Sequence, residues 1–380
     1  MQSSNTTLTI IRDYRQFLEL KDKWNQLVAR NYATGVWLRH EWYDCWWQAF
    51  GAGAQMFVLT MSDDGRLVAA LPLMIVPMRI KGLRQRVLRF IANGITPRSN
   101  FIMPDISKGQ MQAAWAEVFR HSSEWDLAIL ANLEQDSRGY TIWRDYLKAE
   151  NIRNVELPER ISPYIDLSEG WDAVFASFGK NLRRNLNRAK TRMSKESGFE
   201  LIECTAAADV REALRHCYDI SKVSWKGQQG VDMGGSGQRT RFYDLITEQA
   251  ITNGWINIWL LKMGGKYVAF EYAFASGGYV LPVAADYDPE FRQFSPGTVL
   301  RSLELEQLCK RSMATYDFAG TVYDYKLFWT KKTRPHSQFW LFHSGFKSRL
   351  LYFVKAKLLP AFKRAPKPPV QAETETDGEE

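Results

Sequence analysis

The sequence lacks any long uncharged apolar run, although 45% of its 380 residues are hydrophobic. No stretch approaches the roughly 18 consecutive apolar residues of a transmembrane helix, and residues 1–7 are polar, unlike a secretory signal. Metal-site spacings are also missing, because the four cysteines form no CxxC or CxxH pair and the five histidines lie apart. We therefore expect no metal and no disulfide framework, and a protein of the reducing cytoplasm.

Acidic residues are scarce outside the C-terminal end. The net charge is +8, yet residues 371–380 hold five acids and no base. Positive charge is concentrated in residues 180–195, with seven Lys or Arg, and residues 331–364, with nine, and neither stretch contains an acid. Such stretches attract phosphates, anionic lipid heads or nucleic acid. Because residues 180–195 contain no aromatic side chain for base stacking, nucleic acid is not an expected partner.

The length suits two domains, and strands alternate with helices along both halves. In the first half the pattern predicts strands at 7–11, 55–61, 67–74, 87–92 and 127–130, and helices at 14–30, 40–50, 111–121 and 141–150. In the second half it predicts helices at 171–196, 210–223, 240–252 and 296–311, and strands at 199–203, 255–263, 267–275, 279–285, 316–318 and 336–342. Residues 227–237 hold five glycines and are predicted to form a mobile loop.

An internal echo suggests that the two halves are related. Leu59-Thr60-Met61, a glycine turn and Val68-Ala69-Ala70 resemble Leu261-Lys262-Met263, a glycine turn and Val268-Ala269-Phe270. The methionines are 202 residues apart and the valines 200, so the first turn is expected to be two residues longer. We predict two halves of one fold that face each other across a cleft.

A helix start at Ser295-Pro296-Gly297 follows the apolar strand 279–285. Serine is a favoured N-cap, and proline is favoured in the first helical turn. The free N–H groups of Gly297, Thr298 and Val299 would then form an anion site. The nearby Arg292 would add a charge-assisted contact. The plain alternative is a capped helix without a ligand.

The order of these elements resembles the GNAT acyltransferase fold, and residues from about 178 to 342 resemble the acetyltransferase domain of its Fem-like branch. That branch includes proteins of cellulose and exopolysaccharide biosynthesis and, more distantly, the peptidoglycan aminoacyltransferases. The resemblance rests on five motifs: Lys180-Asn181-Leu182-Arg183-Arg184, Ser224-Trp225-Lys226-Gly227, Ser295-Pro296-Gly297, Tyr316-Asp317-Phe318-Ala319-Gly320 and Tyr325-Lys326-Leu327-Phe328-Trp329. The first half resembles the degenerate first domain of such tandem proteins. Its Arg98-Ser99-Asn100 replaces the acidic Ser-Asp-Tyr motif that this domain often carries.

The resemblance implies a mixed α/β fold of two tandem GNAT-like domains, each a mixed central sheet flanked by helices. We place the degenerate domain at 1–165, the acetyltransferase domain at 166–345, a basic amphipathic helix at 346–364 and a disordered acidic tail at 365–380. The helix at 346–364 is expected either to pack on the domain or to lie on an anionic membrane surface. The fold also implies that acetyl-CoA or another acyl-CoA is the co-substrate, with its pyrophosphate at Arg292, Ser295, Gly297, Thr298 and Val299.

Four side chains are candidate catalytic groups, each with a simpler alternative. The resemblance places Asp317 and Lys326 near the reacting centre, where Lys326 would stabilise negative charge. Otherwise Asp317 caps a turn and Lys326 extends from a core-facing helix. At the end of its strand, Asp286 is a candidate base or a turn residue. Tyr323 is a candidate proton donor to the departing thiolate or a packing residue.

Acceptor contacts are expected from two places. Trp225 and Lys226 border the glycine loop as a lid over the acceptor or as its anchor. Arg183 and Arg184 would bind a phosphate of a nucleotide sugar or lipid-linked acceptor, unless they form a solvated helix face.

Three functions remain open at this stage. The first is acyl transfer from acyl-CoA to an amine or hydroxyl of an envelope or exopolysaccharide sugar, or of its precursor. The second is aminoacyl transfer from charged tRNA to a peptidoglycan precursor, the only case in which a nucleic acid is a partner. The third is a non-catalytic scaffold in polysaccharide synthesis. The expected setting is cytoplasmic, with peripheral contact at the inner membrane surface as an option.

Overall fold

The computed structural model describes residues 6–31, 35–80, 82–105, 107–196, 198–320 and 324–358. Within these residues twelve strands form one mixed sheet in the order β1-β2-β3-β4-β5-β12-β6-β11-β10-β9-β8-β7. The strands of the first half are β1 (Thr6–Ile11), β2 (Gln55–Asp63), β3 (Arg66–Ile80), β4 (Leu83–Phe90), β5 (Leu127–Glu134) and β6 (Arg153–Asp166). Those of the second half are β7 (Phe199–Cys204), β8 (Ile256–Met263), β9 (Lys266–Ser276), β10 (Tyr279–Tyr287), β11 (Thr315–Asp317) and β12 (Thr333–Phe342).

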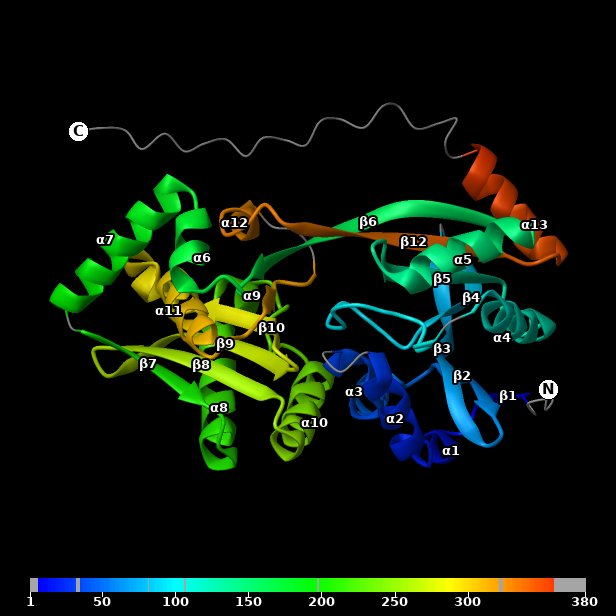
Figure 1. The fold of residues 1–380 in the computed structure, drawn as a ribbon, viewed down its shortest axis with the longest axis horizontal. Coiled ribbons are helices and arrows are strands. Elements are labelled where there is room, and N and C mark those ends of the chain that lie inside the picture. The colour runs from blue at the N-terminus through cyan, green and yellow to red at the C-terminus, as the bar shows by residue number, and fades with distance from the viewer. Residues whose placement is uncertain are drawn as a thin grey trace.

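Helices cover the sheet on both halves, as expected for a mixed α/β fold (Figure 1). The first half contributes α1 (Tyr14–Leu18), α2 (Lys21–Asn31), η1 (Val36–Leu38), α3 (His40–Phe50), α4 (Lys108–Arg120) and α5 (Arg138–Ala149). The second contributes α6 (Trp171–Ser177), α7 (Lys180–Glu196), α8 (Ala207–Val223), α9 (Trp225–Gln228), α10 (Gly237–Asn253), η2 (Pro289–Phe294), α11 (Pro296–Lys310), α12 (Asp324–Leu327), α13 (Phe346–Phe353) and η3 (Val354–Leu358). No helix among the described residues is long and apolar enough to span a bilayer.

The hairpins β2–β3 and β8–β9 have the same register, which supports the duplication. Met61 faces Ala69 as Leu261 faces Ala269, and both hairpins carry an irregularity at the next position. The turns also agree: Asp64 and Gly65, like Gly264 and Gly265, all have positive φ, as a two-residue type I′ turn requires. Our expectation of a longer first turn is therefore wrong, because the true offset between the hairpins is 200 throughout. The methionines were a misleading guide to alignment.

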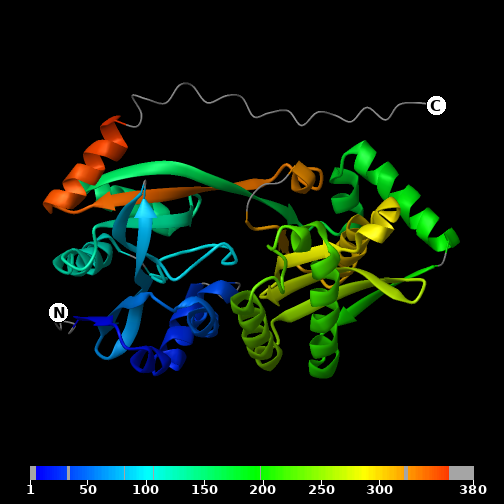
Figure 2. The same cartoon turned by 180° about the vertical axis from the view of Figure 1, so that it is seen from behind.

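The last strands of the two halves are exchanged. β6 pairs with β11 of the second half, and β12 returns to lie between β5 and β6. Figure 1 shows β6 and β12 running along one edge of the molecule past both halves, and Figure 2 shows the same path from behind. The predicted boundary at residue 165 thus falls within a strand that belongs to both parts of the sheet.

Two local expectations need correction. The predicted helix at 171–196 is broken where buried Phe178 adopts an extended conformation before Gly179, and the helix at 14–30 is divided into α1 and α2. β6 was not anticipated, because Pro158 and Pro163 interrupt its sequence and proline is disfavoured inside a sheet. Pro158 lies at the irregularity where β6 meets β12.

One apolar core joins the halves. It contains residues from α2, α3, β2 and β3 together with residues from α8, α10, β8 and β9. At its centre α3 meets α10, where the Trp42 and Phe242 rings lie 5.2 Å apart. Because this core is continuous, the relative placement of the two halves is set by packing as well as by the shared strands.

Candidate active site

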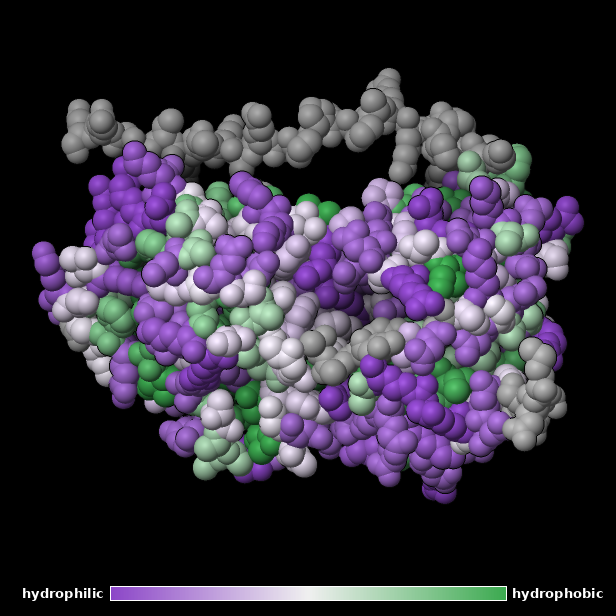
Figure 3. Space-filling model, in the orientation of Figure 1, coloured by the Kyte–Doolittle hydropathy of each residue, from purple (hydrophilic) through white to green (hydrophobic). Residues whose placement is uncertain are grey.

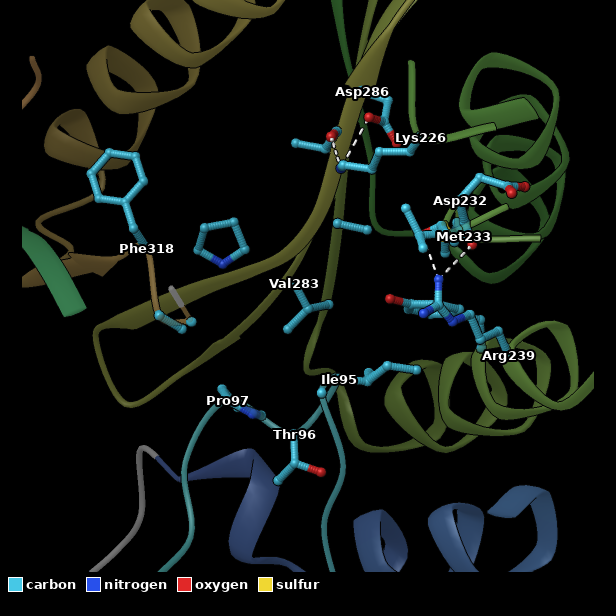
Figure 4. A pocket seen from close by; sticks show the side chains of 18 of the residues that line it. Ile95, Thr96, Pro97, Lys226, Asp232, Met233, Arg239, Val283, Asp286 and Phe318 are labelled. Atoms are coloured by element: carbon cyan, nitrogen blue, oxygen red, sulfur yellow. Dashed lines mark hydrogen bonds and ion pairs between the residues drawn. The ribbon is translucent and has the colours of Figure 1, made fainter. Parts of the chain in front are cut away.

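A cavity of about 790 Å³ lies between the two halves. Space-filling Figure 3 shows the surface hollowed between them. The second half contributes residues 282–286 of β10, residues 318–320 after β11, Tyr325 and Lys326 of α12, and a lid segment, residues 225–233. The first half contributes the loop 93–97, which Figure 4 shows below β10.

The cavity exists because β10 and β11 diverge. They pair in parallel only where Tyr279 and Val280 meet Thr315 and Tyr316. Beyond this point β10 continues to Tyr287 beside β9, while β11 ends at Asp317. The register of β10 shifts between Pro282 and Ala284, and an irregularity of this kind bends a strand away from its neighbour. A ligand can therefore enter between two strands of the sheet.

Asp286 lies in this opening and is almost fully buried. Ser221 donates a hydrogen bond of 2.7 Å to Oδ2, and Lys226 Nζ lies 2.9 Å from Oδ1 (Figure 4). Burial raises the pKa of the Asp286 carboxyl above its usual range, although Lys226 acts in the opposite direction. The result is a carboxylate with more basic character than an exposed aspartate, in contact with the cavity.

Lys326 faces the same cavity and is also buried. Its Nζ donates to the carbonyl oxygens of Phe318 at 3.2 Å and Ala319 at 3.0 Å. These carbonyls are available because Ala319 and Gly320 both have positive φ. Burial, with the nearby Arg301 charge, lowers the pKa of Lys326 to about 8. This amine is therefore mostly charged at neutral pH and loses its proton slightly above it.

Asp317 occupies a different position, since it is fully buried and outside the cavity lining. Its Oδ2 accepts from Arg98, from Tyr279 at 2.6 Å and from Arg334 at 2.6 Å. Its Oδ1 accepts from the Ala319 N–H at 2.8 Å, which is the turn-capping contact considered above. Arg98 comes from the first half and Arg334 from β12, so these contacts tie the two halves together.

The start of α11 differs in detail from the expected anion site. Ser295 has φ +50°, and its side chain makes no capping hydrogen bond. Its carbonyl oxygen instead accepts the N–H groups of Thr298 at 3.0 Å and Val299 at 3.1 Å. Two of the three expected free donors are thus already used within the helix. Arg292 is exposed and Val299 is core, and none of the five predicted pyrophosphate contacts lines the cavity.

Of the predicted acceptor contacts, the structure brings two to the cavity. Trp225 and Lys226 line it, and Lys226 Nζ also donates to the Ala285 carbonyl oxygen at 2.8 Å. Arg183 and Arg184 lie on α7, outside the cavity lining. Tyr323 lies outside the described residues.

Three arginines of the cavity were missed by sequence reasoning. Arg301 of α11 donates to Glu271 at 2.6 Å and to the Tyr316 hydroxyl at 2.9 Å. A sequence signal for this pair existed, because Glu271 interrupts an otherwise apolar strand. Arg239 donates to the backbone oxygens of Val231 and Asp232, and so holds the lid segment. Arg160 comes from β6, whose place in the sheet had no local signal.

Comparison with known proteins agrees with this geometry. Residues 177–327 match the model of the acetyltransferase (GNAT) domain family. No curated protein matches the sequence significantly.

Three solved structures share the fold at low sequence identity. FemX is 12% identical, with a TM-score of 0.58 over 83% of this chain and 95% of its own. A tandem GNAT protein from the clavulanic acid biosynthesis pathway is 13% identical, with a TM-score of 0.50 over 90% and 99%. The lysylphosphatidylglycerol synthetase L-PGS from Bacillus licheniformis is 10% identical, with a TM-score of 0.52 over 90% and 96%. The chain has a GNAT acetyltransferase fold in a tandem arrangement.

Proposed function

We propose that this protein transfers an acyl group, most simply acetyl, from acyl-CoA to an amine or hydroxyl of a sugar or sugar precursor of the cell envelope. The observation that carries the proposal is that Asp286 and Lys326 face one cavity where β10 and β11 diverge. A thioester is already activated, so the reaction needs positioning, a base and charge stabilisation, without a covalent enzyme intermediate.

The two side chains have complementary roles in this reaction. Asp286 takes the proton from the attacking amine or hydroxyl as its bond to the thioester carbonyl carbon forms. The charged Lys326 stabilises the developing oxyanion, and then supplies a proton to the departing thiolate. Lys226 and Ser221 orient the Asp286 carboxylate through the contacts described above.

Charge in the cavity favours an acceptor that carries an anionic group. The lining contains Arg160, Lys226, Arg239, Arg301 and Lys326, against Asp232 and Asp286. A phosphate or carboxylate on the acceptor would be attracted to this lining. Phosphorylated sugars and nucleotide sugars have this property.

Thiol release from acetyl-CoA, measured over a panel of neutral, amino and phosphorylated sugars, tests the proposal. We expect release that depends on the acceptor, is fastest for an anionic acceptor and is lost in Asp286→Asn. Calorimetry with coenzyme A gives a separate readout of donor binding. Absence of both coenzyme A binding and thiol release would overturn the proposal.

Aminoacyl transfer from charged tRNA is the second candidate, favoured by the similarity to FemX and L-PGS. A gel-shift assay with charged tRNA distinguishes it from the first. A shift by tRNA without coenzyme A binding would favour this alternative. Failure of both ligands would leave the scaffold function.

A further inference from the structure

The end of the first half that carries α13 exposes an unusual number of large apolar side chains. Phe346, Leu350 and Phe353 of α13 are 84%, 55% and 53% exposed, and Leu83, at the end of the β3–β4 hairpin, is 63% exposed. The spacing of four and three residues places the three α13 side chains on one face of the helix. In Figure 1 this helix lies at the opposite end of the molecule from α7.

The opposite face of α13 is firmly packed, so the exposed face is a feature of a folded helix. Leu351 and Tyr352 pack on the small core of Val87, Leu127 and Phe342, which Met78 and Ile80 of the hairpin also cover. Ser348 is fully buried, and its hydroxyl accepts the His343 N–H at 3.0 Å. The helix and the hairpin therefore share one support and belong to one surface.

This surface is strongly basic. Residues 76–91 of the hairpin contain five Lys or Arg and no acid, and residues 331–364 contain no acid either. Arg79, Arg84 and Arg349 are exposed. The nearby Asp126 is buried and is neutralised by Lys347 at 2.9 Å and Arg86 at 3.3 Å. We name the surface formed by Leu83, Phe346, Leu350 and Phe353, with Arg79, Arg84 and Arg349, the apolar-basic face.

We propose that the apolar-basic face docks on a membrane that contains anionic lipid. Apolar side chains beside cations are the composition that binds the headgroup region, where the former enter the acyl boundary and the latter meet lipid phosphates. A second copy of the chain is a poorer occupant, because a two-fold contact sets the same patch against itself and brings its arginines together. Docking goes beyond the proposed acyl transfer and does not depend on it.

Vesicle sedimentation of the full chain tests the proposal. We expect binding to phosphatidylcholine vesicles that contain phosphatidylglycerol, weaker binding to phosphatidylcholine alone, and a loss of affinity as salt is raised. The variant Phe346→Ser/Leu350→Ser/Phe353→Ser should lose at least about tenfold in affinity. Arg79→Gln/Arg84→Gln/Arg349→Gln should lose about fivefold for each removed charge on anionic vesicles.

Leu18→Ser is the matched control, because Leu18 is an exposed leucine of α1 outside this face. It should bind vesicles as the unchanged protein does, and thermal melts should show that every variant is folded. Equal binding of the serine variant and the unchanged protein would overturn the proposal. So would an unchanged protein that ignores anionic vesicles but forms a dimer that the serine substitutions dissociate.

Discussion

The segments that follow the fourth strand differ between the halves, although the hairpins before them share one register. In the second half β10 continues beside β9, and Asp286 faces Phe270. In the first half Ala70 stands at the place of Phe270, and it pairs instead with Ile102 from the segment after β4. The corresponding opening of the first half is therefore closed by its own chain.

Aromatic packing completes this closure. The Phe101 ring lies 5.2 Å from Trp143, which lies 4.7 Å from Trp115. Residues 93–97 of the same segment line the cavity of the second half. The comparison teaches that one copy of a duplicated fold can lose its own opening and still contribute to the site of the other.

The largest expected effect concerns the contacts that hold the two halves in register. Arg98→Met leaves the Asp317 carboxylate with one cation fewer in a fully buried position. Breaking a buried ion pair in this way costs about 3–5 kcal/mol of unfolding free energy. Denaturant unfolding measures it, with Arg211→Met at the exposed Arg211–Glu248 pair as a control that should leave the midpoint unchanged. Equal effects of the two substitutions would show that the contact does not join the halves.

The next effect tests the opening of the second half. Lys326→Met removes the charge while keeping side-chain length, so turnover should fall about 100-fold. Acyl-CoA affinity should stay nearly unchanged, because the charge acts on the transition state. The control is Lys310→Met, at a surface pair with Glu306. Full turnover in Lys326→Met would remove this residue from the reacting centre.

The pH dependence sharpens the assignment of roles. The rate should rise as Asp286 loses its proton, at a pH above that of an exposed aspartate, because burial raises its pKa. It should fall again near pH 8, where Lys326 loses its proton. The alkaline decline should disappear in Lys326→Met. A rate that instead rises through pH 8 would identify the neutral amine as the base and reverse the two roles.

A smaller effect is expected at the second residues of α11 and α4, which are both glycines. At Gly297 an added Cβ would lie 3.6 Å from the Tyr287 ring, while at Gly109 it would meet no atom within 4 Å. Gly297→Leu should weaken coenzyme A binding about tenfold without unfolding the protein, if α11 begins at the donor site. Gly109→Leu is the matched control in the closed half and should leave affinity unchanged. Calorimetry decides, and equal affinities would refute the donor-site assignment.

The smallest effect tests the duplicated turn itself. Gly65 and Gly265 have φ of +78° and +82°, and neither has a neighbour within 4 Å of an added Cβ. Gly65→Ala and Gly265→Ala should each cost about 1–2 kcal/mol, because an L-residue is strained in this conformation. Thermal unfolding should give similar losses for both. A clear inequality would show that the two turns are not equivalent.

Turn chemistry and apolar periodicity were sufficient to predict most helices, both hairpins and the start of α11 at Pro296. Those signals are local, since each depends on residues within a few positions along the chain. The candidate site was partly accessible for the same reason. Asp286 and Lys326 stand beside recognisable strand and helix ends, and the structure brings both to one cavity.

Tertiary structure alone decided which segments meet. β6 is proline-interrupted, and its partner β12 lies well over a hundred residues further along the chain, so no local pattern announced either the strand or the exchange. The contact of Asp317 with Arg98, and the entry of residues 93–97 into the other half's cavity, follow from that exchange and from the shared core. Local sequence determines what each segment becomes, whereas burial and long-range strand pairing determine its neighbours, because those energies arise only when the whole chain is packed.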